Sequence, residues 1–251
     1  MAVTKRDAAM LLRKYLVRIL TLGDAGSVRS RRIQRFFRPA RVRLFMMPIK
    51  PVGGRYGYWR GRSVDRRYIE TFLLDNREFI RGRCLEVGDA RYSKEFEGTR
   101  VQSIDVLDVV STNEKATIIG DLQDLSSIED GSYDCVIVTQ VLQYLQDPSA
   151  GVGELRRILA PGGSALVTVP TMAPVDHESP DVQRFMPIGI RNLFNLHFDE
   201  ADTVITSYGN LLTGLAYWTG LAQEDLPGRA WNLNDPIYPV IITIRATSPQ
   251  G

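Results

Sequence analysis

Apolar and polar positions alternate in blocks along most of this chain. From Val64 onward, short apolar runs alternate with stretches of helical periodicity. The runs are rich in Val, Ile and Leu, as strands covered on both faces are. The predicted strands are 83–87, 100–104, 116–119, 133–138, 164–169, 202–207 and 238–245. Such alternation is typical of βαβ units, so we expect an α/β, Rossmann-like fold in which helices flank a seven-stranded, mostly parallel sheet.

Helical stretches fill the gaps between these runs. Residues 64–79 precede the first run, and GVGELRRILAPGG at 151–163 ends in the proline and glycines that stop a helix and lead into a strand. The sequence LLTGLAYWTGLAQEDL at 211–226 separates the last two runs.

The N-terminal part of the chain has a different pattern. Leu12, Leu16, Ile19 and Leu20 fall near one face of a predicted amphipathic helix. A looser basic segment follows, and its prolines and glycines at 48–55 favour a linker. We expect a basic helical extension or lid over residues 1–55 and one α/β domain over residues 56–251.

The formal net charge of +2 conceals a strong asymmetry. Residues 1–67 hold 18 Lys/Arg against 3 Asp/Glu, and the remainder holds 13 against 26. The basic part would suit an anionic acceptor, a membrane surface or RNA, but its charges would equally pair with the acidic domain or form a homodimer interface. Tyr56, Tyr58 and Trp59, which stand among arginines, could cover a ligand site, stack on an acceptor or form an ordinary interface.

Composition excludes several classes of protein. With 44% hydrophobic and 24% charged residues in 251, the chain is neither disordered nor a disulfide-rich module. Cys84 and Cys135 fall inside predicted strands, which favours a structural role and a reducing compartment. Charged residues interrupt the apolar stretch at 11–22, so we expect no transmembrane segment or signal peptide, and a cytoplasmic protein.

Polar residues follow the predicted strands at the edge where open parallel sheets bind ligands. These residues are Glu86, Gly88 and Asp89, then Asp105 with Asp108, then Gly120 and Asp121, then Thr139 and Gln140. An acid about 20 positions after the first loop can accept both hydroxyl hydrogens of a ribose. Asp105 follows Gly88 by 17 residues, which fits this role, and Asp121 could accept from an exocyclic adenine amine.

With these residues in place, the chain resembles the class I S-adenosylmethionine-dependent methyltransferases, in particular the small-molecule type. The segments that carry the resemblance are LEVG at 85–88, SID at 103–105, IGDLQDL at 119–125, SYDCVIVTQVLQYLQD at 132–147 and LRRILAPGGSALVTVP at 155–170. It covers roughly residues 68–245. The later YGNLLTGLAYWTGLAQEDL and DPIYPVIITIRA are also similar to a bacterial subgroup found beside glycosyltransferases.

The resemblance implies S-adenosylmethionine as cofactor and S-adenosylhomocysteine as product. It implies contacts from Glu86, Gly88 and Asp89 to the amino-acid part, from Asp105 to the ribose, from Asp121 and Leu122 to the adenine, and from Gln140 beside the methyl-donor end.

The first loop departs from the family pattern. The family loop reads E-x-G-x-G-x-G, and here Gly88 matches the first glycine, while Ala90 and Tyr92 occupy the other two places. A tyrosine adopts a positive φ only at a steric cost. Either the loop follows a different course, with Asp89 or Tyr92 contacting the ligand, or it no longer binds the cofactor well.

Methyl transfer from a sulfonium is an in-line displacement, so the protein mainly aligns the reactants and adds a base when the nucleophile is a hydroxyl. His177 lies in the segment after the fifth strand, on the usual substrate side in this family, and is the candidate base. His197 follows a helical pattern and is predicted to be structural. No carboxylate follows the fourth strand, and Asn/Asp-Pro-Pro-aromatic is absent there, so we expect neither a metal nor a DNA substrate.

The favoured hypothesis is a methyltransferase that modifies a small-molecule or carrier-linked acceptor, most often at oxygen, in specialised-metabolite or glycan biosynthesis. One alternative is a methyltransferase-like fold that serves as a scaffold subunit or a non-methylating enzyme. The other is an RNA methyltransferase, for which the N-terminal arginines would form the binding surface.

Overall fold

The computed structural model describes residues 49–96 and 100–250. Its contacts divide the chain into two units, Met1–Ile49 and Lys50–Gly251. The predicted N-terminal helix and most of the predicted extension lie outside the described residues, whereas residues 50–55 belong to the second unit. Within the described ranges, no helix combines the length and the apolar composition needed to cross a bilayer.

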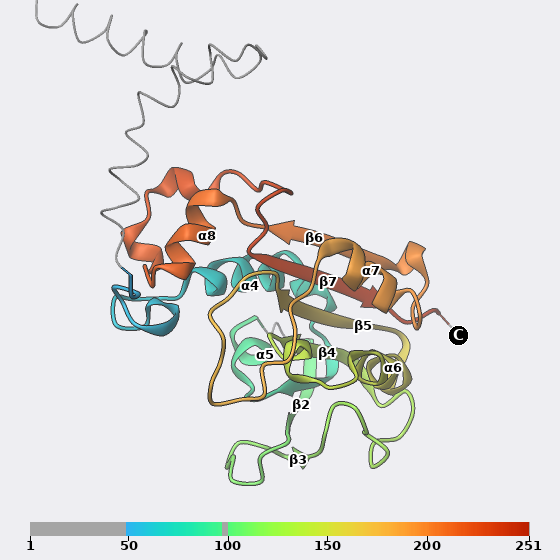
Figure 1. Cartoon of the computed structure of the whole chain (residues 1–251). Helices are drawn as coiled ribbons and strands as arrows, with labels where there is room; N and C mark the ends of the chain where they lie inside the picture. Colours follow the sequence, from blue (N-terminus) through green and yellow to red (C-terminus); the bar gives the residue numbers. More distant parts are fainter. Residues whose placement is uncertain (1–48, 97–99, 251) are drawn as a thin grey trace, which may run out of the picture. The chain divides into compact units, whose positions relative to one another are not determined.

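The second unit is built on a seven-stranded sheet with the order β3-β2-β1-β4-β5-β7-β6 (Figure 1). The strands are β1 (Gly82–Val87), β2 (Val101–Asp108), β3 (Ile118–Ile119), β4 (Tyr133–Thr139), β5 (Leu159–Pro170), β6 (Thr203–Tyr208) and β7 (Ile241–Thr247). β1 to β5 pair in parallel, and β7 lies antiparallel between β5 and β6. The predicted fold class is confirmed. The strand order reverses between β1 and β4, which is the switch point where such sheets bind ligands.

β2 is longer than the sequence predicts, and this matters for the candidate site. The predicted strand ends at Ile104, but the observed strand continues to Asp108. Asp105 interrupts the apolar run and therefore resembles a strand end, yet it pairs with Leu85 in the middle of the sheet. The carboxyl end of β2 consequently lies four residues later than predicted.

Helices cover both faces of the sheet (Figure 1). They are α4 (Val64–Asp75), α5 (Arg91–Phe96), α6 (Pro148–Ile158), α7 (Pro187–Phe194) and α8 (Leu211–Trp218). Buried residues of α4, α5 and α8 share one core cluster, and those of α6 and α7 share another. The sheet therefore separates two apolar layers, each closed by an amphipathic helical face.

The two cysteines lie opposite each other on neighbouring strands. Cys84 of β1 pairs with Cys135 of β4, and both are free and fully buried. The hydrogen bond with Cys84, together with burial, raises the pKa of Cys135. Their predicted role as small core residues is confirmed.

The segment Lys50–Arg62, which we call the strap, is held against the domain by arginines. Arg55 pairs with Asp176 at 2.6 Å and with Glu178 at 2.9 Å. Arg60 pairs with Asp225 at 2.6 Å, and the Arg62 guanidinium contacts a domain carboxylate as well. For these residues, the basic N-terminal charge does pair with the acidic domain, which is one of the two alternatives left open above.

Candidate functional site

The residues that follow β1 and β4 form the candidate site at the switch point. Gly88 comes directly after β1 and has φ +92°, a conformation that only glycine adopts without a steric cost. A Cβ placed on Gly88 would meet no described atom within 4 Å. The Gly88 backbone therefore borders open space, as expected for a loop that a ligand approaches closely.

Glu86 stabilises this loop from beneath. Its side chain is buried, and its two carboxylate oxygens accept hydrogen bonds from the backbone amides of Tyr92 at 3.0 Å and Ser93 at 2.7 Å. These amides belong to the first turn of α5, where a helix lacks internal acceptors. Glu86 thus fixes the start of α5 relative to β1, and its carboxylate is not turned toward the open edge as the sequence predicted.

The acid that ends β2 is Asp108, not Asp105. The Asp105 carboxylate accepts from the hydroxyls of Thr117 and Tyr133, each at 3.1 Å, within the sheet. The structure therefore does not bring Asp105 to the edge where the ribose contact was predicted. Asp108 occupies that position instead.

Asp108 connects the loops that follow β1 and β3. Its Oδ2 accepts from Asn113 Nδ2 at 2.6 Å, and the same nitrogen donates to the Gly88 carbonyl at 2.7 Å. The Asp108 carbonyl accepts from the Gly120 amide at 3.0 Å. Asp108 also follows Gly88 by 20 positions, the spacing typical of an acid that binds ribose.

In the loop after β3, Asp121 is exposed and Leu122 is buried. Asp121 is exposed, and its Oδ1 accepts from the Gln123 amide at 2.9 Å. The Leu122 side chain is buried in the core beside α6. The Gln123 side-chain amide also donates to both carboxylate oxygens of Asp121, at 3.1 and 3.0 Å. Asp121 is therefore exposed at the edge with its carboxylate oriented by Gln123, whereas Leu122 can offer only its main chain.

Gln140 follows β4 in a conformation unusual for a residue with a side chain, with φ +57°. Its amide donates to the Thr168 carbonyl at 2.9 Å, and its carbonyl accepts from Gln143 Nε2 at 2.7 Å. Gln143 is buried, and its Oε1 has no hydrogen-bond partner among the described residues. Strained backbone and an unpaired buried oxygen at one strand end are typical of a functional site.

A polar pocket of about 210 Å³, which we call the edge pocket, lies at the ends of β4 and β5. It is lined by Thr139, Gln140, Gln143 and Tyr144 after β4; Pro170, Ala173, Asp176, Asp181 and Arg184 after β5; Tyr56 and Tyr58 of the strap; and Asp65, Arg66 and Tyr217 from α4 and α8. The predicted aromatic cluster is thus divided, because Tyr56 and Tyr58 line the pocket while Trp59 is 85% exposed.

A tyrosine and a carboxylate meet in the wall of the edge pocket. Tyr144 Oη donates to Asp176 Oδ2 at 3.2 Å. Burial and the nearby Asp176 carboxylate raise the pKa of Tyr144, so the phenol keeps its proton at neutral pH. The other carboxylate oxygen, Oδ1, accepts from Arg55 Nη1 at 2.6 Å and from the Glu178 amide at 3.0 Å. Oδ2 therefore keeps capacity to accept a further proton donor.

His177, the candidate base predicted from the sequence, does not line the edge pocket. Its side chain is exposed, and the residue beside it, Asp176, occupies the pocket wall. His197 bonds with the Ser149 hydroxyl at 2.9 Å at the start of α6. This contact fits the structural role predicted for His197. Asp176 lines the edge pocket and therefore replaces His177 as the candidate base.

Tyr92 does not obstruct the glycine-poor loop. It lies in the first turn of α5, so it needs no positive φ, and its buried ring packs on Phe96 with a centroid distance of 6.3 Å. Its hydroxyl accepts from Arg66 Nη1 at 2.6 Å. The ring that replaces the third glycine is therefore packed into the core and does not fill the loop.

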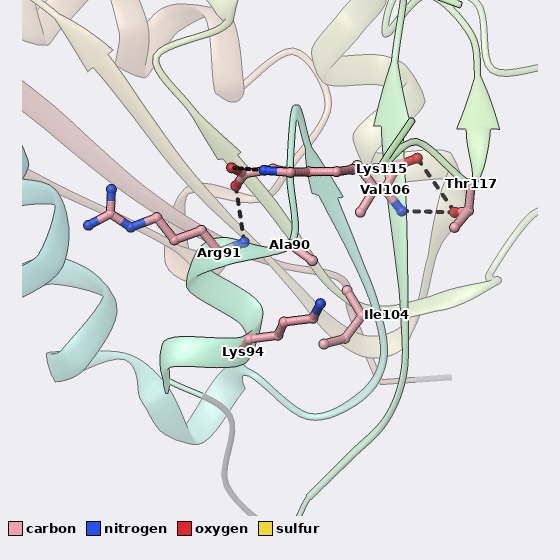
Figure 2. Close-up of a pocket in the computed structure, with 8 residues that line it drawn as sticks. Ala90, Arg91, Lys94, Ile104, Val106, Lys115 and Thr117 are labelled. Carbon is pink, nitrogen blue, oxygen red and sulfur yellow. Dashed lines mark hydrogen bonds and ion pairs between the residues drawn. The ribbon is translucent and has the colours of Figure 1, made fainter. Parts of the chain in front are cut away.

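A larger groove of about 440 Å³ lies beside this loop, on the face of the sheet that α5 covers. Figure 2 shows Lys94 of α5 and Ile104 and Val106 of β2 turned toward the same space. Asp89 and Ala90, which follow β1, also line this groove, whereas the residues that follow β4 and β5 line the edge pocket, to which we attribute the candidate chemistry.

S-adenosylmethionine fits the residues at the edge. The open space beside Gly88 admits a ligand against the backbone, and acids at the ends of β2 and β3 can accept from ribose hydroxyls and an adenine amine. Gln140, which follows β4, belongs to the wall of the edge pocket. Neither Ala90 nor Tyr92 blocks this path.

No site role is assigned to Asp108 or to Asp176 from the sequence, although the sequence contains a signal for each. The spacing of 20 residues after Gly88 already favoured Asp108 over Asp105. Asp176 directly precedes His177 and was overlooked in its favour. The RNA hypothesis rests on N-terminal arginines that lie mostly outside the described residues.

Comparison with known proteins agrees with this geometry. The sequence pattern of a family described as "Methyltransferase domain" matches residues 86–167, from within β1 to within β5. An uncharacterised protein in transposon Tn4556 of Streptomyces fradiae is 37% identical over 65 residues, which cover 26% of this chain and 19% of that protein. The chain therefore matches only about a fifth of that relative's length.

Two solved structures share the fold. A SAM-dependent methyltransferase from Archaeoglobus fulgidus aligns with a TM-score of 0.51 at 15% identity, covering 73% of this chain and 94% of that one. The [4+2]-cyclase SpnF aligns with a TM-score of 0.51 at 14% identity, covering 81% and 89%. Residues 86–167 therefore match a methyltransferase domain, and the sheet that contains them has the fold of a SAM-dependent methyltransferase.

Proposed function

We propose that this protein methylates a hydroxyl group on a small-molecule or carrier-linked acceptor bound in the edge pocket. The observation that carries the proposal is the Asp176 carboxylate in the pocket wall, with Oδ2 bonded only to Tyr144 among the described residues. A hydroxyl nucleophile must lose its proton as the methyl group transfers, and a carboxylate within hydrogen-bond reach can accept it.

The cofactor would be held along the switch-point edge. We assign the Gly88 and Asp89 backbone to the amino-acid part, Asp108 to the ribose and Asp121 to the adenine. When bound, S-adenosylmethionine supplies an electrophilic methyl group on sulfur. Glu86 acts indirectly, because it holds the loop and α5 in place through the Tyr92 and Ser93 amides.

The acceptor would be oriented by the polar wall of the edge pocket. Burial raises the pKa of Tyr56 to about 12, so its hydroxyl, like that of Tyr144, stays protonated. Tyr56 donates this proton to the Pro174 carbonyl and Tyr144 donates to Asp176, so each phenol oxygen can accept a hydrogen bond from the acceptor. Arg55 balances the charge of Asp176 from the strap side. An acceptor hydroxyl that donates to Asp176 Oδ2 would pass its proton there as it is methylated.

Substituting Asp108 by alanine should weaken S-adenosylhomocysteine binding by about 1–3 kcal/mol, because hydrogen bonds to a charged group are lost. Isothermal titration of the purified protein measures this directly. Asp105→Ala is the matched control, since its carboxylate bonds Thr117 and Tyr133 within the sheet. A larger loss of affinity for Asp105→Ala than for Asp108→Ala would restore the ribose assignment made from the sequence.

Asp176→Asn should lower the rate of methyl transfer by about 100-fold or more, the usual contribution of a positioned base. The assay follows labelled methyl groups from S-adenosylmethionine to a panel of hydroxylated aromatic compounds and sugars. His177→Ala, one position along the same loop, should leave the rate within about twofold, since a general base must lie within reach of the proton it removes. Equal losses in the two variants, or a product methylated at nitrogen, would contradict the proposal.

A further inference from the structure

α8 has large apolar side chains on its outward face, where helices of globular domains normally carry polar residues. Leu211, Leu215 and Trp218 are spaced so that they share one face, and they are 54%, 44% and 50% exposed. Ala216 and Tyr217 pack into the core on the other side. The helix LLTGLAYW contains no charged residue. Both faces of α8 are therefore apolar, although one of them is exposed.

Neighbouring residues extend this exposed face at both ends of α8. At its N-terminal end, Asn210 Nδ2 donates to the carbonyl of Leu233, whose side chain is 62% exposed. At its C-terminal end, the Val52 amide donates to the Thr219 carbonyl at 2.9 Å, so the strap, with its 48% exposed Val52 side chain, lies beside this end of the helix. We define the α8 surface as Leu211, Leu212, Leu215, Trp218, Leu233, Val52 and Trp59, each of them at least 44% exposed.

The charge of the chain that precedes this surface indicates what covers it. Residues 1–48 hold 12 Lys/Arg against 2 Asp/Glu, and they join the described domain next to Val52 in the chain. Leucine and tryptophan on a surface, combined with a strongly basic segment, are the features that hold a protein at an anionic membrane. A water-exposed surface of seven large apolar side chains is otherwise unfavourable.

We propose that the α8 surface docks on the face of an anionic lipid bilayer, with its leucines and tryptophans entering the headgroup region. Tyr217, on the opposite side of α8, lines the edge pocket, as does Tyr58 of the strap. The docked surface therefore lies about one helix diameter, roughly 10 Å, from that pocket. The docking does not depend on the identity of the acceptor or on methyl transfer.

The test is co-sedimentation of the full chain with vesicles of phosphatidylcholine containing phosphatidylglycerol, compared with vesicles of phosphatidylcholine alone. We expect binding to the anionic vesicles that weakens as salt is raised. The double substitution Leu215→Gln with Trp218→Gln should lower the partition coefficient at least about tenfold, since two apolar side chains no longer enter the lipid. Glutamine adds no charge, so the attraction of the basic segment is unchanged.

Ile188→Gln is the matched control and should bind as the parent does. Ile188 is 75% exposed on α7, which covers the other face of the sheet. Leu211→Gln with Leu233→Gln provides a second test should the first double variant fail to fold, as judged by circular dichroism.

Three results would overturn the proposal. They are no binding to anionic vesicles at low salt, binding that the folded double variants retain in full, and a dimer that dissociates on these substitutions while vesicles are not bound. The last result would assign the α8 surface to a second copy of the chain. None of these measurements involves methyl transfer, so a failure here is distinct from a failure of the proposed function.

Discussion

Replacing Gly88 by leucine is expected to lower the affinity for S-adenosylhomocysteine by about 2–3 kcal/mol, or roughly 30- to 150-fold. The new side chain would meet no described protein atom within 4 Å at its Cβ, so it would extend into the space that we assign to the cofactor. The positive φ of +92° adds backbone strain of about 1–2 kcal/mol to the folded state. Calorimetric titration measures the affinity, and urea unfolding measures the strain.

Gly131→Leu separates these two effects. Gly131 also has a positive φ, +65°, and its nearest neighbour to an added Cβ is 3.8 Å away, but it precedes β4 at the opposite edge of the sheet. We expect the same loss of stability with unchanged affinity. If both variants lost affinity equally, backbone strain alone would explain the result and Gly88 would lose its place in the cofactor site.

The second large effect is expected on stability, from Glu86→Ala. This substitution leaves the Tyr92 and Ser93 amides without their acceptor in a buried environment, at a cost of about 1–3 kcal/mol for each group. We expect the free energy of unfolding in urea to fall by about 2–4 kcal/mol. Glu129→Ala, at an exposed glutamate, should change it by less than about 0.5 kcal/mol. A loss below 1 kcal/mol for Glu86→Ala would show that water or a rearranged loop replaces the carboxylate.

The pH dependence of stability offers an independent check on Glu86. Burial raises its pKa, and the hydrogen bonds from Ser93 and Tyr92 offset this only in part. The folded state therefore holds the proton more tightly than the unfolded chain does. Its contribution is fully present below the unfolded pKa of about 4.3 and is lost as the pH rises through the raised folded pKa. This dependence should disappear in Glu86→Gln.

The pattern of apolar and polar positions predicted the fold class and placed the candidate site at the carboxyl edge of the sheet, because the period of apolar residues indicates which positions are buried. Gly88 and Asp121 could also be found from the sequence, since each lies within two residues of the end of an apolar run and each does lie at the carboxyl edge. The buried roles of Cys84 and Cys135 followed from the same reasoning. In each of these cases, the deciding information lies within a few residues of the position itself.

Tertiary structure decided which acids lie at the carboxyl edge, although the spacing of 20 residues after Gly88 already favoured Asp108. Asp105 interrupts an apolar run, but hydroxyls contributed by Thr117 and Tyr133 satisfy its carboxylate inside the sheet, so β2 continues to Asp108. Tyr92 occupies a glycine position of the family loop, yet its ring is buried and its hydroxyl accepts a hydrogen bond from Arg66 of α4. These partners are 12 to 28 residues away along the chain, a range over which the pattern of apolar and polar positions does not report which side chains meet.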